Sequence, residues 1–139
     1  MSNQQKSSSL FGEVIYAYTR AQAIADGVLV DVSQTAREAG FRWPVVMTRA
    51  AWEDCVAWSE DDNRHQVYQD QSGRLWDVLW MAMTAIRRIS DGASQTLYQL
   101  YRVPRDGKSN EARLVTLKLV AGPGDAGEPV ITIMLSQED

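Results

Sequence analysis

The spacing of apolar residues changes along the chain, from a period near 3.6 to a period of two in the last third. The clearest helical pattern covers residues 73–89, where one apolar face consists of Leu75, Leu79, Ala82, Ile86 and Ile89. Trp76, Trp80 and Met83 form a second apolar face beside the first. A helix that is apolar over most of its circumference is buried. We therefore expect residues 73–89 to form the long central helix of the core.

Alternation with a period of two marks three segments near the C-terminus, at residues 95–103, 112–120 and 129–135. Polar residues, glycine and proline separate these segments, which is typical of strands that are joined by turns. The connections are too short to hold a crossover helix, so we expect the three strands to be antiparallel neighbours.

The first part of the chain contains shorter elements. Short helices are expected at residues 20–26, 34–39 and 49–58. Each follows a serine or threonine that can cap its first turn. Residues 28–32 are mostly β-branched and read as a further strand. Pro44 argues against a central strand, so residues 41–48 are interpreted as an extended connector, and residues 59–65 as a polar loop.

These elements predict an α+β fold. Its sheet is expected to contain the three C-terminal strands in antiparallel order, with residues 28–32 as a candidate fourth strand. The sheet is expected to pack on the long central helix, with the short helices at the N-terminal side. At 139 residues the chain has the length of one domain, which we place at residues 10–139. The polar, serine-rich residues 1–9 are expected to form a disordered tail.

Charge and cysteine content narrow the classes of function. The net charge is −4, whereas a protein that binds nucleic acid usually carries an excess of Lys and Arg, so no direct binding to nucleic acid is expected. A single cysteine cannot form an intrachain disulfide and fits a reducing compartment. No secretory signal is recognisable, and no apolar run approaches the ~20 residues of a membrane span. We therefore expect a cytoplasmic protein without membrane contact.

One motif suggests a nucleotide. Gly122, Gly124 and Gly127 match the G-x-G-x-x-G spacing of a dinucleotide-binding loop. In such a loop a helix must follow, whose N-terminus receives the pyrophosphate, and an acidic ribose ligand lies about 20 residues further on. Here the motif leads into the apolar segment 129–135, and the sequence ends at Asp139. We therefore interpret the glycines as a turn between two strands and expect no cofactor.

Cys55 and His65 are the only residues of their types, and they could pair as nucleophile and base. Cys55 lies on an apolar helix face, so an inert buried thiol is expected, whereas His65 is expected at the surface. One cysteine and one histidine cannot complete a structural zinc site. Asp77 needs a partner, which Arg74 or Arg88 could supply, and an ion pair is favoured over catalysis.

Five acidic residues fall within ten positions: Glu53, Asp54, Glu60, Asp61 and Asp62. A run of charge is most often a solvent-exposed face. A hard cation could use such carboxylates, although the glycine turn of a calcium loop is missing. A third interpretation is an acidic surface that binds a basic partner. We take these five residues as the candidate partner-binding site and expect no catalytic residue and no bound metal.

Three stretches together resemble a known family: "YTRAQAIADGVLVDVSQTAREAGFRWPVVMTRAAWE", "GRLWDVLWMAMTAIRR" and "VTLKLVAGPGDAGEPVITIML". The family consists of small bacterial proteins of unknown function that are commonly encoded on plasmids, integrative elements and phage-derived islands. The resemblance covers most of residues 14–136. No catalytic residue is established for that family, so the resemblance implies no active site.

The resemblance implies a setting on a mobile genetic element, where small acidic proteins often inhibit host defences such as CRISPR–Cas complexes. We therefore expect a non-catalytic inhibitor that binds a bacterial defence protein or nucleoprotein complex and blocks its basic nucleic-acid channel. One alternative is a small enzyme with a polar site around Asp77, Arg74 and His65. Another is a DNA-binding regulator that uses Arg87 and Arg88. The sequence leaves the oligomeric state open.

Overall fold

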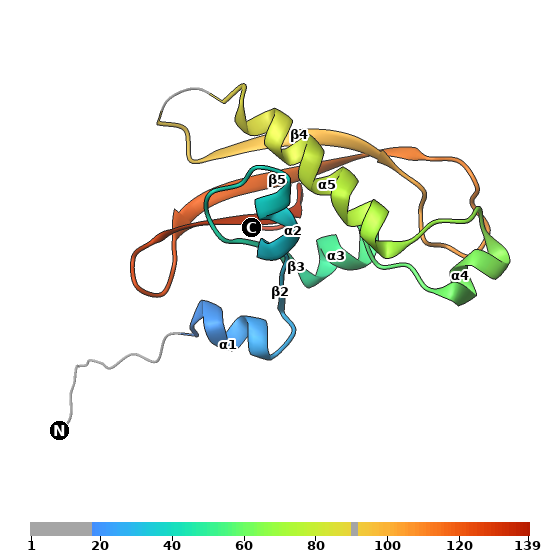
Figure 1. Cartoon of the computed structure of the whole chain (residues 1–139), viewed down its shortest axis with the longest axis horizontal. Helices are drawn as coiled ribbons and strands as arrows, with labels where there is room; N and C mark the ends of the chain where they lie inside the picture. The colour runs from blue at the N-terminus through green and yellow to red at the C-terminus, as the bar shows by residue number, and fades with distance from the viewer. Residues whose placement is uncertain (1–17, 90–91) are drawn as a thin grey trace.

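The fold is built around a five-stranded sheet (Figure 1). The computed structural model describes residues 18–89 and 92–139. The strands are β2 (Leu29–Asp31), β3 (Val45–Thr48), β4 (Gln95–Arg102), β5 (Arg113–Pro123) and β6 (Pro129–Leu135). The helices are α1 (Arg20–Ala25), α2 (Ser33–Glu38), α3 (Arg49–Cys55), α4 (Glu60–His65) and α5 (Gln71–Ile86).

The sheet is mixed, with the order β2-β3-β6-β5-β4. β3 runs parallel to β6, and the other neighbouring strands are antiparallel. The fold is α+β, but the expected sheet of three antiparallel C-terminal strands is wrong, because β3 and β2 extend it beyond β6. Residues 28–32 do contain a strand, β2, and it pairs with β3 and not with a C-terminal strand.

The expected connector at residues 41–48 contains β3, an interior strand of the sheet, and this corrects the interpretation of Pro44. Pro44 precedes the first residue of β3, and its carbonyl accepts a hydrogen bond of 2.9 Å from the Ile131 main-chain N–H. Because proline lacks only the donor, it can join the sheet at this position through its oxygen. The Val45 N–H that follows donates to the Ser33 hydroxyl at 3.0 Å. Val45, Val46 and Met47 are completely buried.

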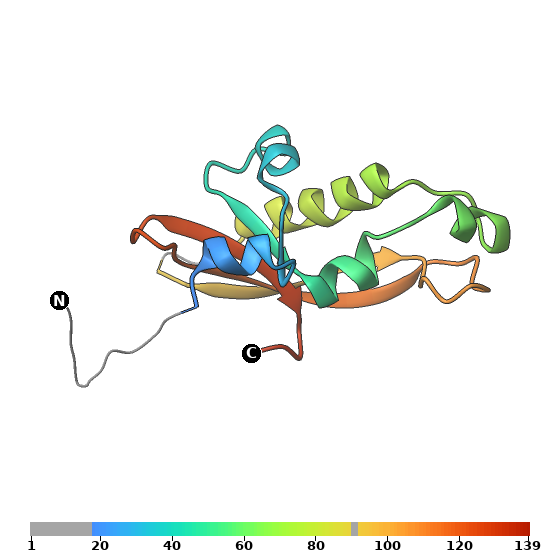
Figure 2. The same ribbon diagram turned by 90° about the horizontal axis from the view of Figure 1, so that it is seen from below.

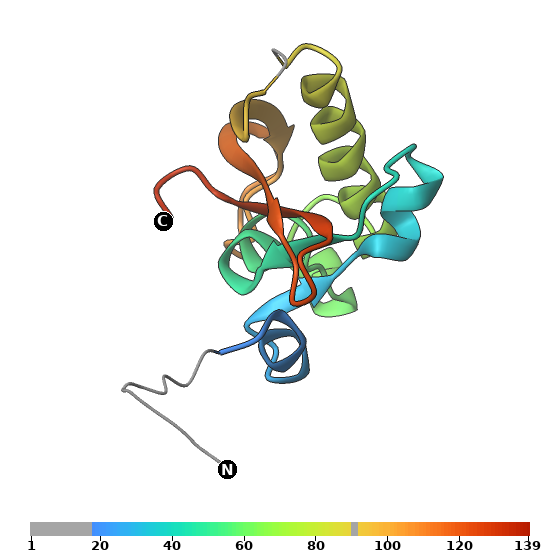
Figure 3. The same ribbon diagram turned by 90° about the vertical axis from the view of Figure 1, so that its left-hand side faces the viewer.

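Helix α5 lies along one face of the sheet as a separate layer (Figures 2 and 3). It is 16 residues long, so the expected long central helix is also wrong. Its Val78, Leu79 and Ala82 side chains are fully buried in the core. Trp76 and Trp80 are 37% and 49% exposed, because a helix that covers one side of a sheet buries only one face.

The strands supply the other half of the core through alternate residues, as the period-two pattern predicts. The core side chains of the strands are Val45, Met47, Tyr98, Leu100, Leu117, Leu119, Ile131 and Ile133. They form one cluster with α5, α2 and α3, so residues on both sides of positions 90–91 build the same core.

The glycine-rich motif forms a turn between β5 and β6, which confirms the interpretation from sequence. The Gly124 N–H donates to the Glu128 carbonyl at 2.6 Å, and the Gly127 N–H donates to the Gly124 carbonyl at 3.0 Å. Gly127 has a φ of +82°, a conformation that side chains with a Cβ rarely adopt. The motif leads into strand β6, so no helix N-terminus is present to receive a phosphate.

Residues 1–17 lie outside the described residues, so the expected tail at residues 1–9 stays a prediction. Across residues 18–89 and 92–139, the structure contains no helix with the length and apolar character of a membrane span.

Candidate functional site

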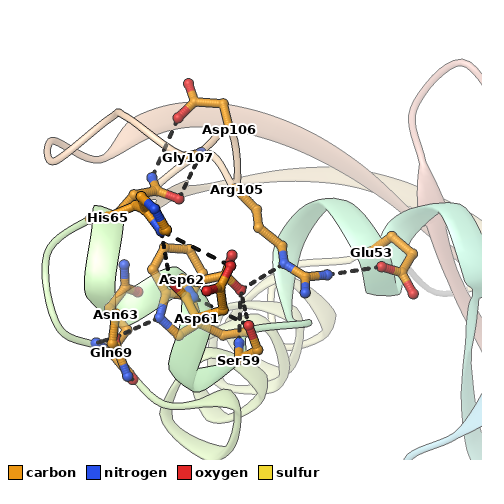
Figure 4. A network of polar contacts seen from close by, with 12 residues as sticks. Glu53, Ser59, Asp61, Asp62, Asn63, His65, Gln69, Arg105, Asp106 and Gly107 are labelled. Carbon is orange, nitrogen blue, oxygen red and sulfur yellow. Dashed lines mark hydrogen bonds and ion pairs between the residues drawn. The ribbon is translucent and has the colours of Figure 1, made fainter.

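The five candidate acidic residues lie on α3 and α4, two helices that Arg105 joins through Glu53 and Asp62 (Figure 4), and we call this region the acidic corner. Glu53 and Asp54 belong to the last turn of α3. Glu60, Asp61 and Asp62 form the first turn of α4, so the polar loop expected at residues 59–65 is a helix. Acidic residues stabilise the first helical turn because the exposed main-chain N–H groups there carry partial positive charge.

Ser59 and Asp62 start α4 through a capping box. The Ser59 hydroxyl accepts from the Asp62 N–H at 3.2 Å, and Asp62 Oδ2 accepts from the Ser59 N–H at 2.7 Å. Desolvation raises the pKa of Asp62, but the hydrogen bonds from Ser59 and Arg105 outweigh it, so this pKa lies below its usual value. Asp62 therefore stays ionised and anchors the helix.

Arg105 joins the two helices of the acidic corner. Its Nε lies 2.8 Å from Asp62 Oδ2, and its Nη1 lies 3.1 Å from Glu53 Oε1 (Figure 4). A planar guanidinium can bind two carboxylates in fixed directions, which a lysine cannot. The pair of contacts sets the position of α4 relative to α3.

The segment that carries Arg105 is held in place by Gln66, a buried polar residue at the end of α4. Its amide nitrogen donates to the carbonyls of Pro104 at 2.7 Å and Ser109 at 2.6 Å. Its amide oxygen accepts from the Gly107 N–H at 3.0 Å. Sequence reasoning missed Gln66, since nothing in the local pattern distinguishes a glutamine that binds distant main-chain groups from one at the surface.

Asp54 has a different role from the other acidic residues. Its Oδ1 accepts from Arg102 Nη2 at 2.9 Å and from Arg102 Nε at 3.1 Å. The Arg102 side chain is 15% exposed and the Asp54 side chain 33%, so this ion pair is largely shielded from water. The ion pair joins α3 to β4. Because Arg102 neutralises the charge of Asp54, this carboxylate presents little net charge to a partner.

Glu60 and Asp61 are exposed carboxylates of the corner that do not contact Arg102 or Arg105. Asp61 pairs with Arg64 at 3.2 Å, but both side chains are about two-thirds exposed, at 68% and 69%. The Glu60 carboxylate receives a long contact of 3.4 Å from Asn63. Exposed pairs of this kind contribute little to stability and exchange readily with other cations.

Arg74 lies behind the corner and is 4% exposed. Its guanidinium donates to the carbonyls of Val56 at 3.1 Å and Val103 at 2.9 Å, and it lies 4.6 Å from the centre of the Trp58 ring. Burial lowers the pKa of Arg74, yet the carbonyls and the ring face supply the negative potential that a buried cation needs. Arg74 thus connects α5, the end of α3 and the end of β4.

The expected ion pair of Asp77 with Arg74 or Arg88 is not formed among the described residues. Arg74 lowers the pKa of Asp77 through its charge, but desolvation dominates and leaves that pKa above its usual value. The Asp77 carboxylate instead lines a hollow beside β4.

The residues of the alternative enzyme site have separate environments. His65 Nδ1 lies 2.9 Å from the Asp61 carbonyl on α4, and His65 lines neither of the hollows that contain Asp77. Arg74 is occupied by main-chain carbonyls, so the structure does not bring His65, Asp77 and Arg74 together as one reactive group.

Cys55 is buried, as expected from its apolar helix face. Burial and the Asp54 charge raise the pKa of its thiol to about 12, against the opposing effect of Arg102 and Arg74. The thiol therefore stays protonated at neutral pH. No group of three His, Cys, Asp or Glu side chains within the described part of the chain is placed to hold a metal ion.

Arg87 and Arg88, the residues of the alternative DNA-binding site, follow the end of α5 and line two different hollows. The two arginines therefore do not form a single basic groove. This arrangement gives no geometric support to that alternative.

One comparison with known proteins gave a result. A family of unknown function, DUF6573, matches residues 8–139. No curated protein and no solved structure matches the chain.

Proposed function

The chain belongs to this family of unknown function, and we propose that it acts without catalysis, by binding a partner protein through the acidic corner. The observation that carries the proposal is the exposure of Glu60 and Asp61 on the first turn of α4, a helix that Arg105 joins to α3 through Asp62 and Glu53. A helix that is already held in position loses little conformational entropy when a partner binds.

The partner surface that fits this corner is basic. Glu60 and Asp61 extend from the first turn of α4 into solvent, where arginine or lysine side chains of a partner can replace the weak contacts to Arg64 and Asn63. Asp54 and Asp62 remain in their internal ion pairs and keep the surface in shape. The contact would therefore centre on α4.

We propose that the partner is the basic nucleic-acid channel of a bacterial defence complex. The protein would then act in the cytoplasm as an anti-CRISPR-like accessory inhibitor that is encoded on a mobile element. Channels that hold nucleic acid are lined by Lys and Arg, and an acidic surface with spaced carboxylates can occupy the place of phosphates. Two points support this choice of partner: the acidic corner matches the charge of a basic channel, and the sequence resembles a family that is commonly encoded on mobile elements.

The test compares two double variants with the same change in charge. Glu60→Gln with Asp61→Asn removes the accessible carboxylates of the corner, whereas Glu38→Gln with Asp139→Asn removes two exposed acids elsewhere. We expect the first variant to lose retention of defence proteins from a bacterial lysate, and to lose protection of phage in a plaquing assay with active CRISPR. The second variant should retain both.

Equal behaviour of the two variants would show that net charge, not the corner, governs binding. Retention by the unmodified protein should also fall as salt is raised, because exposed charges are screened. Absence of any retained partner, together with unchanged plaquing, would refute the proposal. Circular dichroism of both variants controls for loss of α4.

A further inference from the structure

Strand β4 forms an open edge of the sheet, and exposed apolar side chains lie around it. It ends the strand order and pairs on one side only, with β5, among the described residues. The opposite edge, β2, is three residues long and contacts α1. Long edge strands without charge are sites of strand pairing, and proteins usually protect them. From Gln95 to Tyr101, β4 has no charged residue and no proline.

The edge carries a patch of half-exposed apolar side chains, which we call the β4 edge patch: Trp76, Trp80, Met81, Leu97, Tyr101 and Leu114. Two hollows of about 520 and 310 Å³ run along the strand between β4 and α5, and they share Met81 and Gln99. The Trp76 and Trp80 rings stack with centroids 6.0 Å apart beside the first hollow. Exposed apolar side chains that cluster along one strand edge mark an interaction site.

The hydrogen-bond pattern shows which main-chain groups of β4 are not bonded to β5; among these, the Leu97 carbonyl accepts a long hydrogen bond of 3.4 Å from the Thr96 hydroxyl. The Ala121 N–H donates to the Ser94 carbonyl at 2.8 Å, so Ser94 faces β5. Because bonding direction alternates along an antiparallel strand, the N–H and C=O groups of Leu97, Gln99 and Tyr101 point away from the sheet. These three alternate residues can therefore form main-chain hydrogen bonds with another strand.

We propose that the occupant of this edge is a second copy of the chain, whose β4 pairs antiparallel with the first and continues the two sheets into one. The argument is the sequence Leu97–Tyr101, "LYQLY", which complements itself when two copies are centred on Gln99. Each leucine then lies opposite a tyrosine of the other copy, and Gln99 lies opposite Gln99. Aliphatic–aromatic cross-strand pairs are favourable, and no like charges meet.

The register also agrees with the main-chain pattern. Centred on Gln99, every outward-bonding residue of one copy faces an outward-bonding residue of the other, as an antiparallel ladder requires. A two-fold axis through this point makes the interface self-complementary, which is the usual form of a dimer contact.

The available surface is sufficient for a dimer. At roughly 200 Å² for a complete large side chain, full covering of the half-exposed β4 edge patch would bury roughly 600 Å² per copy. Two copies together then reach the ~1,200 Å² at which specific interfaces begin. This inference uses a surface separate from the acidic corner and does not depend on the proposed function.

The first test is Gln99→Pro with Gln95→Pro as its matched control. Both glutamines belong to the outward-bonding set, so the fold loses no internal ladder bond in either variant. Proline at the centre removes the donors that link the two copies and is expected to raise the dimer dissociation constant at least tenfold. Proline at Gln95, the end of the strand, should have little effect. Sedimentation or light scattering over a concentration series measures this constant.

The second test fixes the register and does not require proline to be tolerated. Gln99→Cys places two thiols opposite each other at the ~5.5 Å Cα separation of a bonded pair, which a disulfide can span. Oxidation should therefore crosslink Gln99→Cys into a covalent dimer, whereas the two thiols of a Gln95→Cys dimer lie far apart in this register and should form no crosslink. The native Cys55 is buried and does not interfere.

A monomeric unmodified protein at ~100 μM, well above typical weak-dimer constants, would overturn the proposal and leave the edge to a foreign strand. A dimer that is unaffected by Gln99→Pro and not crosslinked through Gln99→Cys would place the interface elsewhere and would overturn it as well.

Discussion

At the scale of single residues, Arg74 is the one charged side chain that is buried within the part of the chain that the structure describes. A buried cation normally has a carboxylate beside it, because removing a charge from water costs several kcal/mol. Arg74 has instead the carbonyls of Val56, Asp54 and Val103 and the face of Trp58. These carbonyls lie at the ends of α3 and β4, so one side chain supplies hydrogen-bond donors to main-chain groups at the ends of both elements.

Replacing Arg74 is therefore expected to destabilise the fold strongly. Arg74→Met keeps the length of the apolar stem but leaves buried carbonyls without donors, and we expect a loss of about 3 kcal/mol in the free energy of unfolding. Urea denaturation measures this loss. Arg64→Met is the control: it removes an arginine from an exposed pair and should change stability by less than about 0.5 kcal/mol. Similar losses for both variants would contradict a structural role for Arg74.

Residue-level prediction from sequence succeeded where the cause is local. Cys55 was expected to be buried because its neighbours keep the spacing of an apolar helix face, and this is confirmed. Arg74 was expected only as a possible ion-pair partner of Asp77, and Gln66 was not identified, since the partners of both are main-chain groups far along the chain. The five acidic residues do share one corner, but their internal arginine partners could not be predicted from spacing alone.

At the scale of elements, strand β3 shows where sequence patterns fail. Its first three residues are apolar without alternation, which is typical of a strand buried on both faces. The adjacent Pro44 argued against that interpretation, yet proline immediately before a strand loses no ladder bond. The C-terminal strands were found because each alternates clearly, whereas the parallel pair of β3 with β6 leaves no local signal.

The turn between β5 and β6 allows a test of the glycine motif. A Cβ at either Gly122 or Gly127 meets no atom within 4 Å, but only Gly127 has a positive φ, of +82°. Gly127→Ala is expected to lower the free energy of unfolding by about 1–2 kcal/mol through backbone strain. Gly122 lies in an ordinary strand conformation, so Gly122→Ala should leave the free energy of unfolding unchanged or raise it by a few tenths of a kcal/mol. The reason is that alanine restricts the unfolded chain more than glycine does.

Thermal or urea unfolding of the two alanine variants measures this difference. If both glycines instead formed a phosphate cradle, both substitutions would reduce nucleotide binding and the difference in stability would not matter. Equal stability of the two variants would contradict the assignment of Gly127 as the residue that determines the turn.

At the scale of the whole molecule, the sheet combines strands from the first part of the chain, residues 18–89, with strands from the last part, residues 92–139. β3, from the first part, pairs with β6, from the last, and the core cluster contains residues from both. Neither part can bury its apolar residues alone, because the core face of β4, β5 and β6 is covered by α5 and α3. This arrangement is the reason that the short connections among the C-terminal strands were insufficient to predict the complete sheet.

The interleaved sheet predicts that the chain unfolds in a single cooperative step. All five tryptophans lie at or before Trp80, so their fluorescence reports on the first part, whereas β4, β5 and β6 contribute most of the strand signal in far-UV circular dichroism. The two signals should show the same midpoint in urea, because loss of β3 exposes β6 and the shared core. In isolation, a peptide of residues 92–139 should lack stable strand structure. Separate midpoints, or a folded peptide, would show that the C-terminal strands are stable without β3 and α5.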